Sequence, residues 1–392
     1  MKKGLVSDNT DSHRTSILLI GIANSVHTAR WVEQFKDQSF DFTLIPSTAS
    51  RTIHPAIRDL SQQNRELTIN VPGFFKVLSF PIGICDMIFG RRLMGLLIGT
   101  WLLFTRRRFD IVHAMELQHA GYILSSIRPR ATFGKRIVSN WGSDIYWFQR
   151  FPRHRKRLKK LLEESTHYAC ECQRDIGLAL NLGFSGTTMD VQPNAGPIAL
   201  EDIEKGETSL FPSQRRIILV KGYTGFVGRA DIALKALSLC SEELKGYEIL
   251  LYSTDRRSRR LARKLSNESG VEIRSFKKYK MNHDQMLQLF RESRVYLGIS
   301  MSDGISTSLL EAIASGAFPI QSDTSCADEW VINGTNGFIV PWDNPVEISK
   351  CIQKALTDDV LVDSAREINT QISLKRLSPE RVESSRKTFY ST

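Results

Sequence analysis

The sequence lacks any run of about eighteen apolar residues, the length that a membrane-spanning helix needs. Its start, Met1-Lys-Lys-Gly, lacks the apolar segment of a secretory signal, so we expect no such signal. Cysteines are few, and the close pair Cys170 and Cys172 has no second pair to complete a zinc site. We therefore expect free thiols in a cytoplasmic protein, without a bound metal or cofactor.

Acidic residues are fewer than basic ones, 42 against 53, which leaves a net charge of +11. Such an excess indicates an anionic partner, which can be nucleotide phosphates, an anionic lipid surface or nucleic acid. The basic residues lack the interleaved aromatic side chains that bind single strands, so we expect no nucleic acid. The length of 392 residues exceeds one ordinary core and predicts two domains.

Short apolar runs alternate with segments of helical spacing along the whole chain. We expect strands at residues 16–22, 42–45, 109–114, 136–140, 216–220, 247–252, 271–275, 295–300, 318–321 and 337–340. This alternation predicts an α/β fold with two doubly wound, Rossmann-like parallel sheets. Ligands then bind at the carboxyl ends of the strands, and we expect the two sheets to face each other across a cleft.

The pattern breaks and restarts near residues 193–215, which sets the expected domain boundaries. We expect a disordered tail at residues 1–15, a first domain at 16–196, a polar linker at 197–214 and a second domain at 215–370. Residues 371–392 are expected to form a C-terminal helix that can cross back to the first domain.

The segment Asp303-Gly-Ile-Ser-Thr-Ser-Leu-Leu-Glu311 is the strongest functional signal. It follows an apolar run and leads into helical spacing, so it indicates a strand, a loop and a helix start. The free amides of a helix start attract phosphate, and carboxylates on either side can accept hydrogen bonds from sugar hydroxyls. The pattern therefore predicts a site for a nucleotide-sugar. A plainer alternative is a capping box, in which Ser308 and Glu311 close the helix start.

The surroundings of this segment resemble the retaining glycosyltransferases of the GT-B fold, in particular group 1, glycosyltransferase family four. That family has an acidic residue, seven others and then Glu, as Asp303 and Glu311 are spaced here. The later stretch INGTNGFIVPWDNPVEI is also similar, and the resemblance covers nearly the whole chain. It implies that Asp303 faces the donated sugar and Glu311 the ribose hydroxyls. By the same resemblance the diphosphate lies against the loop residues Gly304, Ser306, Thr307 and Ser308.

The chain departs from the family after the first strand of the second domain. Where the family carries an Arg and a Lys that reach the diphosphate, this chain has Tyr223 and Gly228. We predict that Arg229 binds the diphosphate instead, because a guanidinium suits bidentate contacts, and that Lys221 is the weaker candidate. Both can alternatively be surface charges. Gly222 and Tyr223 complete the donor-binding candidates.

A second departure lies in Asn140-Trp-Gly-Ser-Asp144, where the family often has a His in place of Trp141. Trp141 can stack on a sugar face, because its ring offers apolar area and one hydrogen-bond donor. Asp144 can orient a loop or accept a hydrogen bond from a hydroxyl of the sugar acceptor. The alternative is that Asp144 is a helix N-cap.

The first-domain loop that begins at Gly21 resembles the family's first glycine-containing loop. It supplies Asn24, and His27 and Arg30 follow on one helical face. Glu116 and His119 follow the strand at residues 109–114, at its carboxyl end. We expect these residues on the acceptor side of the cleft, with a structural role for the histidines as the alternative.

Two segments suggest contact with a membrane surface. Residues 93–105 are mostly apolar and lie between arginine clusters, and residues 150–160 are strongly basic. The first is too short to span a bilayer, so it is an interfacial helix or a core helix of the first domain. The second can bind anionic headgroups or be a solvated helix face. A lipid-linked acceptor would explain both segments.

These observations predict a retaining, metal-independent glycosyltransferase that moves a sugar from a nucleoside-diphosphate sugar to a hydroxyl of a glycan or lipid-linked acceptor. We expect it in surface polysaccharide or glycoconjugate synthesis, peripheral on the inner face of the cytoplasmic membrane. One alternative is a nucleotide-sugar epimerase of the same architecture, which would need no acceptor. Another is a non-catalytic basic protein that binds membranes.

Overall fold

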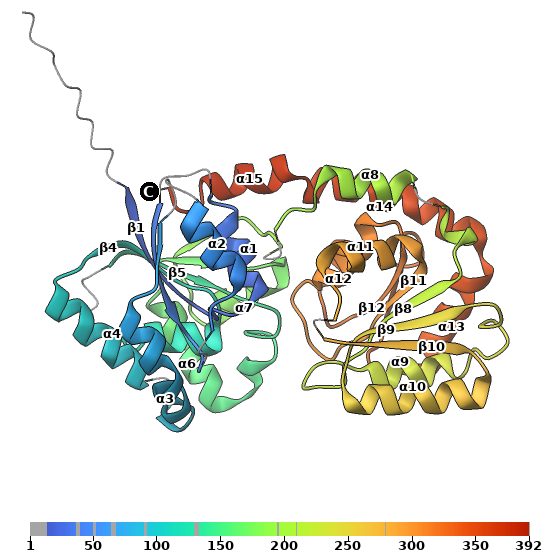
Figure 1. Ribbon diagram of the computed structural model, residues 1–392, viewed down its shortest axis with the longest axis horizontal. Coiled ribbons are helices and arrows are strands. Elements are labelled where there is room, and N and C mark those ends of the chain that lie inside the picture. Colours follow the sequence, from blue (N-terminus) through green and yellow to red (C-terminus); the bar gives the residue numbers. More distant parts are fainter. Residues whose placement is uncertain are drawn as a thin grey trace, which may run out of the picture. The chain divides into compact units, whose positions relative to one another are not determined.

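The computed structural model describes residues 14–36, 40–49, 52–63, 68–89, 92–128, 133–193, 196–208, 210–278 and 280–391 (Figure 1). Contacts divide the chain into two compact units, Met1–Ser139 with Glu164–His167, and Asn140–Glu163 with Tyr168–Thr392. The chain contains two sheets with the expected helices, which confirms the predicted α/β class. The boundaries expected from the sequence stay predictions. Of the expected tail, residues 1–13 lie outside the described residues, and Thr15 begins the first strand.

The first sheet has seven strands in the order β3-β2-β1-β4-β5-β6-β7. β1 pairs in parallel with both β2 and β4, and its residues Ile17 and Leu19 are fully buried because a central parallel strand is covered on both faces. The short strands β3, β6 and β7 are absent from the sequence-based expectation. The bounds are β1 Thr15–Gly21, β2 Phe40–Pro46, β3 Thr68–Asn70, β4 Phe109–Ala114, β5 Phe133–Ser139, β6 His167–Ala169 and β7 Thr187–Thr188.

Glycines decide how the first helices pack. A Cβ at Gly99 would lie 2.2 Å from the carbonyl oxygen of Arg128, and one at Gly95 would lie 2.5 Å from Cβ of Ser126. The helix that carries both glycines can therefore approach the backbone of residues 123–128 closely. The helical segments here are α1 Val26–Glu33, α2 Pro55–Gln63, α3 Gly73–Phe89, α4 Arg92–Thr105, a π-helix at Leu117–Gly121 and α5 Tyr122–Leu124.

The second sheet has six strands in the order β10-β9-β8-β11-β12-β13. Its pairs are parallel, and Val220, Leu297 and Ile320 from three of the central strands are fully buried in one core. The strands are β8 Ile217–Lys221, β9 Glu248–Thr254, β10 Glu272–Lys277, β11 Ser293–Gly298, β12 Phe318–Ser322 and β13 Phe338–Val340. The helices that alternate with them are α9 Ala230–Leu237, α10 Arg256–Ser269, α11 His283–Glu292, α12 Thr307–Ala314 and α13 Pro345–Thr357.

Much of the expected polar linker is helical. α8 spans Leu200–Thr208 and packs against α14, Asp359–Leu377, with Ile203 fully buried. Residue 371, the expected start of the C-terminal helix, falls inside α14, and the chain continues into α15, Pro379–Lys387. The remaining helices are α6 Pro152–Glu163 and α7 Gln173–Asn181. None of the helices in the described ranges has the length and apolar character to cross a membrane.

His113 on β4 makes the stability of the first unit depend on pH. Its ring is fully buried, hydrogen-bonds with Oγ of Ser139 at 2.7 Å and lies edge-on to Trp31. Burial lowers the pKa of His113 to about 3. In the unfolded chain the histidine has its ordinary pKa. Below that pH the unfolded chain therefore binds a proton that the folded chain does not bind.

We predict that stability therefore falls on acidification, by about 2 kcal/mol between about pH 7 and pH 5 from this group alone. Urea unfolding of wild type and His113→Gln at the two pH values measures the difference. The variant should lose less stability on acidification than the wild type does. Equal losses in both proteins would show that His113 does not cause the effect.

Candidate functional site

The loop between β11 and α12 is held by contacts with the residues that follow β12. The amide of Asp303 donates to the carbonyl of Thr324 (3.3 Å), and Oγ1 of Thr324 donates to the carbonyl of Ser300 (2.5 Å). The amide of Gly304 then donates to Oδ1 of Asp303 at 3.0 Å. Because β11 and β12 are parallel neighbours, these contacts place the half-buried Asp303 at the carboxyl edge of the second sheet.

Glu311 does not close the start of α12, so the capping-box alternative is wrong. The N-cap is Ser306, and Ser308 is already the second residue of the helix. Glu311 lies farther along the helix, where its side chain cannot reach back to the N-cap amide. It is buried, and His283 at the start of α11 donates from Nε2 to Oε1 of Glu311 at 3.0 Å.

The start of α12 leaves backbone donors unused. The amides of Ser306, Thr307 and Ser308 meet no acceptor among the described residues, while the next amide, of Leu309, donates to the carbonyl of Ser306 (2.9 Å). Thr307 and Ser308 are half-buried. Free amides at a helix start carry partial positive charge and bind anions, phosphate above all.

Lys221 brings a full positive charge to the same place. At the end of β8 its Nζ lies 3.5 Å from Oδ2 of Asp303 and donates to Oγ of Ser306 at 3.2 Å. Burial lowers the pKa of Lys221, but Tyr223, Asp303 and Tyr296 raise it, and the net value lies above the ordinary lysine pKa. Lys221 is therefore a cation at the start of α12. The sequence ranked it below Arg229, yet it is Lys221 that contacts Asp303.

The glycine-rich loop after β8 is anchored by hydrogen bonds of its first residues. The amide of Gly222 donates to the carbonyl of Tyr252 (2.8 Å), and Oγ1 of Thr224 donates to Asp255, the N-cap of α10, at 2.7 Å. Gly228 has no room for a side chain, since a Cβ there would lie 2.3 Å from the ring of Tyr223. These contacts therefore restrict the backbone conformation of the loop that leads into α9.

Arg229 is the N-cap of α9 and is half-buried. Its Nη1 donates to the carbonyl of Gly228 (3.0 Å), its Nη2 to the sulfur of Met301 (3.0 Å), and its guanidinium lies 5.3 Å from the centre of the Trp342 ring. Met301 precedes Asp303 by two residues, so Arg229 lies near the loop that was predicted to bind phosphate. Its role there stays a prediction.

Residues 141–144 contact the Asp303 loop. Gly142 adopts the left-handed conformation (φ 48°), and a Cβ on it would lie 3.3 Å from Oδ1 of Asp303. Oγ of Ser143 donates to the carbonyl of Ser302 at 3.3 Å. Oδ2 of Asp144 accepts from the amide of Trp141 (3.2 Å), so this carboxylate holds a turn and does not cap a following helix. Trp141 itself is half-buried beside this contact.

Arg174 on α7 braces the Asp303 loop, a role that no sequence pattern indicated. Its Nη2 donates to the carbonyl of Asp303 (2.8 Å), its Nη1 to the carbonyl of Thr324 (3.1 Å), and its Nε to Oδ1 of Asp175 (2.9 Å). Its guanidinium also stacks on the ring of Tyr146, 3.9 Å from the ring centre. Arg174 thus fixes the backbone of the loop and leaves the Asp303 carboxylate to Lys221.

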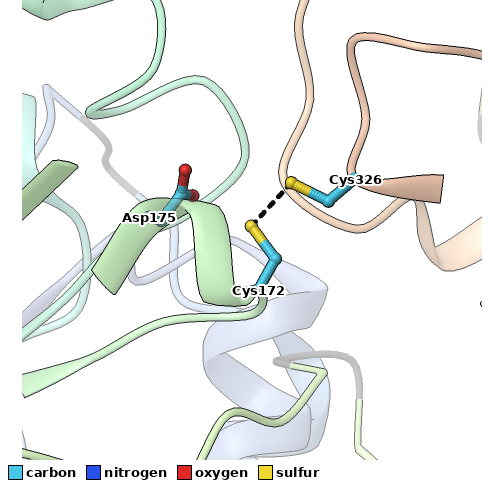
Figure 2. Close-up of side chains that lie close together, drawn as sticks. All are labelled: Cys172, Asp175 and Cys326. Carbon is cyan, nitrogen blue, oxygen red and sulfur yellow. Dashed lines mark hydrogen bonds between the residues drawn. The ribbon is translucent and has the colours of Figure 1, made fainter. Parts of the chain in front are cut away.

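A buried cluster of Cys172, Asp175 and Cys326 lies beside Arg174, which donates to Asp175 (Figure 2). Cys326 donates from Sγ to Sγ of Cys172 at 2.8 Å, and Asp175 on α7 lies close to both sulfurs. The hydrogen bond that the two thiols share and burial both raise the pKa of Cys172, so this thiol keeps its proton. Two thiolates on one zinc ion stand about 3.8 Å apart, given Zn–S bonds of about 2.3 Å in a tetrahedron. In this structure the two sulfurs are closer than that, and their contact ties α7 to the loop after β12.

The candidates of the first unit gather at the carboxyl ends of β1 and β4. A Cβ on Gly21 would lie 3.3 Å from Met115, and the buried Glu116 follows directly. The Glu116 carboxylate accepts from the amides of His119 (2.7 Å) and Ala120 (2.8 Å), so it already caps the π-helix. Asn24 is exposed, and His27 and Arg30 on α1 and His119 are half-buried.

Three residues near the site were not among the sequence predictions: Arg174, His283 and Glu171. Oε2 of Glu171 accepts from the amide of Gly142 (3.3 Å) and would lie 3.0 Å from a Cβ on Gly304. Each of the three has a hydrogen-bond partner that lies more than 25 positions away in the sequence. No local pattern marks such a contact, so one sequence could not have shown them.

Comparison with family models covers most of the chain. Residues 202–372 match the model described as glycosyl transferases group 1, and residues 16–171 match the model described as glycosyl transferase 4-like. No curated protein sequence matches the chain.

Solved structures show the same architecture at low sequence identity. HepE of Anabaena, solved with UDP and glucose, is 14% identical with a TM-score of 0.67, over 97% of this chain and 100% of that one. Sucrose-phosphate synthase of Thermosynechococcus elongatus is 14% identical with a TM-score of 0.66, over 96% and 98%. Trehalose 6-phosphate synthase of Burkholderia multivorans is 12% identical with a TM-score of 0.66, over 96% of each chain. These likenesses show the fold, which is the GT-B architecture.

The positive charge of Lys221 at the start of α12 leads to a testable prediction. We expect Lys221→Met to weaken the binding of inorganic pyrophosphate about tenfold or more, because one charge-assisted hydrogen bond is lost. Lys221→Arg keeps the charge and should lose less. Isothermal titration calorimetry measures both, and an unchanged affinity in Lys221→Met would place the anion elsewhere.

Proposed function

The chain belongs to the group 1 glycosyltransferases, and we propose that it transfers a sugar from a nucleoside-diphosphate sugar to a hydroxyl group with retention of anomeric configuration. The observation that carries the donor part of this proposal is the start of α12. There, amides without recorded protein acceptors, the Lys221 cation and the Asp303 carboxylate lie together. The first two suit a diphosphate, and the third suits sugar hydroxyls.

The ion pair between Lys221 and Asp303 is compatible with donor binding. Both side chains keep some exposure, 14% and 20%, so a ligand can reach them. A diphosphate at the amides of Thr307 and Ser308 would attract Lys221 away from Asp303. The separation of 3.5 Å between Nζ and Oδ2 is longer than a short hydrogen bond, so this ion pair can be exchanged for the diphosphate. Asp303 would then be free to accept hydrogen bonds from the donated sugar.

We propose that Glu311 binds the ribose of the donor. Its carboxylate lies one turn into α12 and is oriented by the hydrogen bond from His283. Two ribose hydroxyls can donate to such a carboxylate, and the histidine leaves one oxygen free for them. His283 then acts as a positioning residue for Glu311.

The proposed reaction needs stabilisation of the departing diphosphate more than a nucleophile. The bond from the anomeric carbon to the phosphate oxygen breaks, and the hydroxyl oxygen of the sugar acceptor bonds to the same face. The departing phosphate oxygen takes the proton of that hydroxyl. Lys221, Arg229 and the α12 amides supply the positive charge that this phosphate requires, so we propose that the reaction is metal-independent. Neither Asp303 nor Glu311 is given a covalent role.

We propose that the sugar acceptor is a glycan or a lipid-linked molecule in surface polysaccharide or glycoconjugate synthesis. The residues near the carboxyl ends of β1 and β4, Asn24, His27, Arg30 and His119, and the Trp141–Asp144 turn are the candidates for contacting it. Trp141 offers ring area for a sugar face. The place of action that fits such an acceptor is the inner face of the cytoplasmic membrane.

Replacing Glu311 tests the donor site. We predict that Glu311→Ala lowers kcat/KM about 10²-fold or more, since the ribose contact helps to hold the donor in the reactive position. Glu311→Gln keeps the shape and should lose less. Glu367→Ala, an exposed position on α14, is the control and should keep full activity. The assay follows release of UDP from UDP-glucose, chosen because HepE was solved with that donor. Full turnover in a folded Glu311→Ala protein would refute the placement.

Arg229 is tested separately, because its side chain donates to Gly228 and Met301 and not to Asp303. We expect Arg229→Met to lower kcat about tenfold or more, through loss of positive charge near the leaving phosphate. Arg229→Lys should recover part of the loss. Arg260→Met on the exposed side of α10 serves as the matched control. If Arg229→Met and Arg260→Met have the same steady-state kinetics as the wild type, Arg229 is a structural residue only.

A further inference from the structure

Helices α3 and α4 carry apolar side chains that the protein itself does not cover. Phe104 on α4 is 86% exposed, Val77 on α3 is 72% exposed and Leu103 is 60% exposed. Among the side chains that the structure describes on these two helices, the other large apolar ones that are exposed are Phe74, Leu78, Ile84 and Leu96. The two helices pack against each other and lie side by side in Figure 1. These side chains together expose apolar surface to water, and an exposed apolar surface often marks a binding site.

This exposed side of α4 is distinct from the side that serves the core. The buried residues of α4 are Met94, Gly95, Ile98, Gly99 and Leu102, and the glycines bring that side against residues 123–128. The sequence left two roles open for residues 93–105, a core helix or an interfacial helix. In the structure the helix has one buried apolar side and one exposed apolar side. A role in the core therefore explains the buried side but not the exposed one.

The charges around this surface are of one sign. Arg92 begins α4, and Arg106, Arg107 and Arg108 follow its last residue, Thr105; all four arginines are exposed. The only acidic residue in α3 and α4 is Asp86, which is buried and accepts from the amides of Leu93 (2.8 Å) and Met94 (2.9 Å). An approaching anionic surface would therefore meet arginine and no exposed carboxylate on these helices.

We propose that this surface, the apolar–basic face, binds the headgroup region of an anionic lipid bilayer. The face consists of the exposed apolar side chains of α3 and α4 with Arg92 and Arg106 to Arg108. Shallow insertion of Phe104 and Leu103 removes apolar area from water, and the neighbouring arginines meet lipid phosphates. The inference rests on the proposed membrane location and names the surface that provides it.

The chemistry favours a bilayer over other occupants. The helices are about 26 Å and 21 Å long at 1.5 Å per residue, and neither is long and apolar enough to cross a membrane, so they can lie only in the interface. Exposed apolar side chains with three exposed arginines just beyond the end of α4 match the step from acyl chains to phosphate headgroups. The basic helix α6 is the competing surface: Arg153, Arg155, Lys156, Lys159 and Lys160 on it are exposed, but its apolar residues Leu158, Leu161 and Leu162 are buried.

The test is co-sedimentation of the full chain with phosphatidylcholine vesicles that contain or lack phosphatidylglycerol. The wild type should bind the anionic vesicles. The double variant Leu103→Ser, Phe104→Ser should bind them about tenfold or more weakly, because the inserted area is lost. Replacing Arg106, Arg107 and Arg108 by Gln should weaken binding to anionic vesicles about 10²-fold and reduce its dependence on salt. The control Ile332→Ser, Val360→Ser changes apolar residues that are comparably exposed elsewhere and should bind as the wild type does.

Several results would overturn the proposal. The first is that the Leu103, Phe104 double variant sediments with the vesicles as the wild type does. The second is that the wild type is absent from both vesicle pellets. The third is that changing Lys156 and Lys160 of α6 to Glu abolishes binding, while changing the face does not. A fourth is an oligomeric wild type together with a monomeric double variant, which would make the face a contact between copies of the chain. Turnover of UDP-glucose in solution should be unchanged in the double variant, so failure here is distinguishable from failure of the proposed activity.

Discussion

The structure of the site depends on one constraint, the open start of helix α12. The helix begins at Thr307 after Ser306, and no acceptor is recorded for the amides there among the described residues. An uncompensated helix start is unfavourable inside a protein unless water or a ligand meets it. Lys221 and Asp303 are arranged around this start, one as cation and one as hydrogen-bond acceptor. The remaining contacts serve to keep the loop before α12 in that position.

The brace for this loop comes from distant sequence. Arg174 holds the carbonyls of Asp303 and Thr324, and Gly142 lies close enough to Asp303 that only glycine fits without adjustment. The thiol contact between Cys172 and Cys326 adds a third tie from α7 to the loop after β12. A loop held at its backbone leaves its side chains free for a ligand, which is how a rigid scaffold positions a binding site.

The sequence predicted the fold because its strands are central and parallel. Such strands are buried on both faces, so β1, β8 and β11 appear as continuous apolar runs, and the family models and solved structures confirm the GT-B prediction. The short strands β3, β6 and β7 carry no such run. The capping-box alternative was wrong because one helix start offers several hydroxyl residues, and Ser306 rather than Ser308 is the cap. Arg174 and His283 could not be predicted, since their partners lie 129 and 28 positions away.

The most direct test of the account is a crystal structure of the chain with a nucleoside diphosphate bound. The account predicts phosphate oxygens within hydrogen-bond distance of the amides of Thr307 and Ser308, with Nζ of Lys221 turned toward them and away from Asp303. The ribose hydroxyls should then meet the free oxygen of Glu311. A diphosphate bound at another edge of the sheet, with the pair of Lys221 and Asp303 intact, would contradict it.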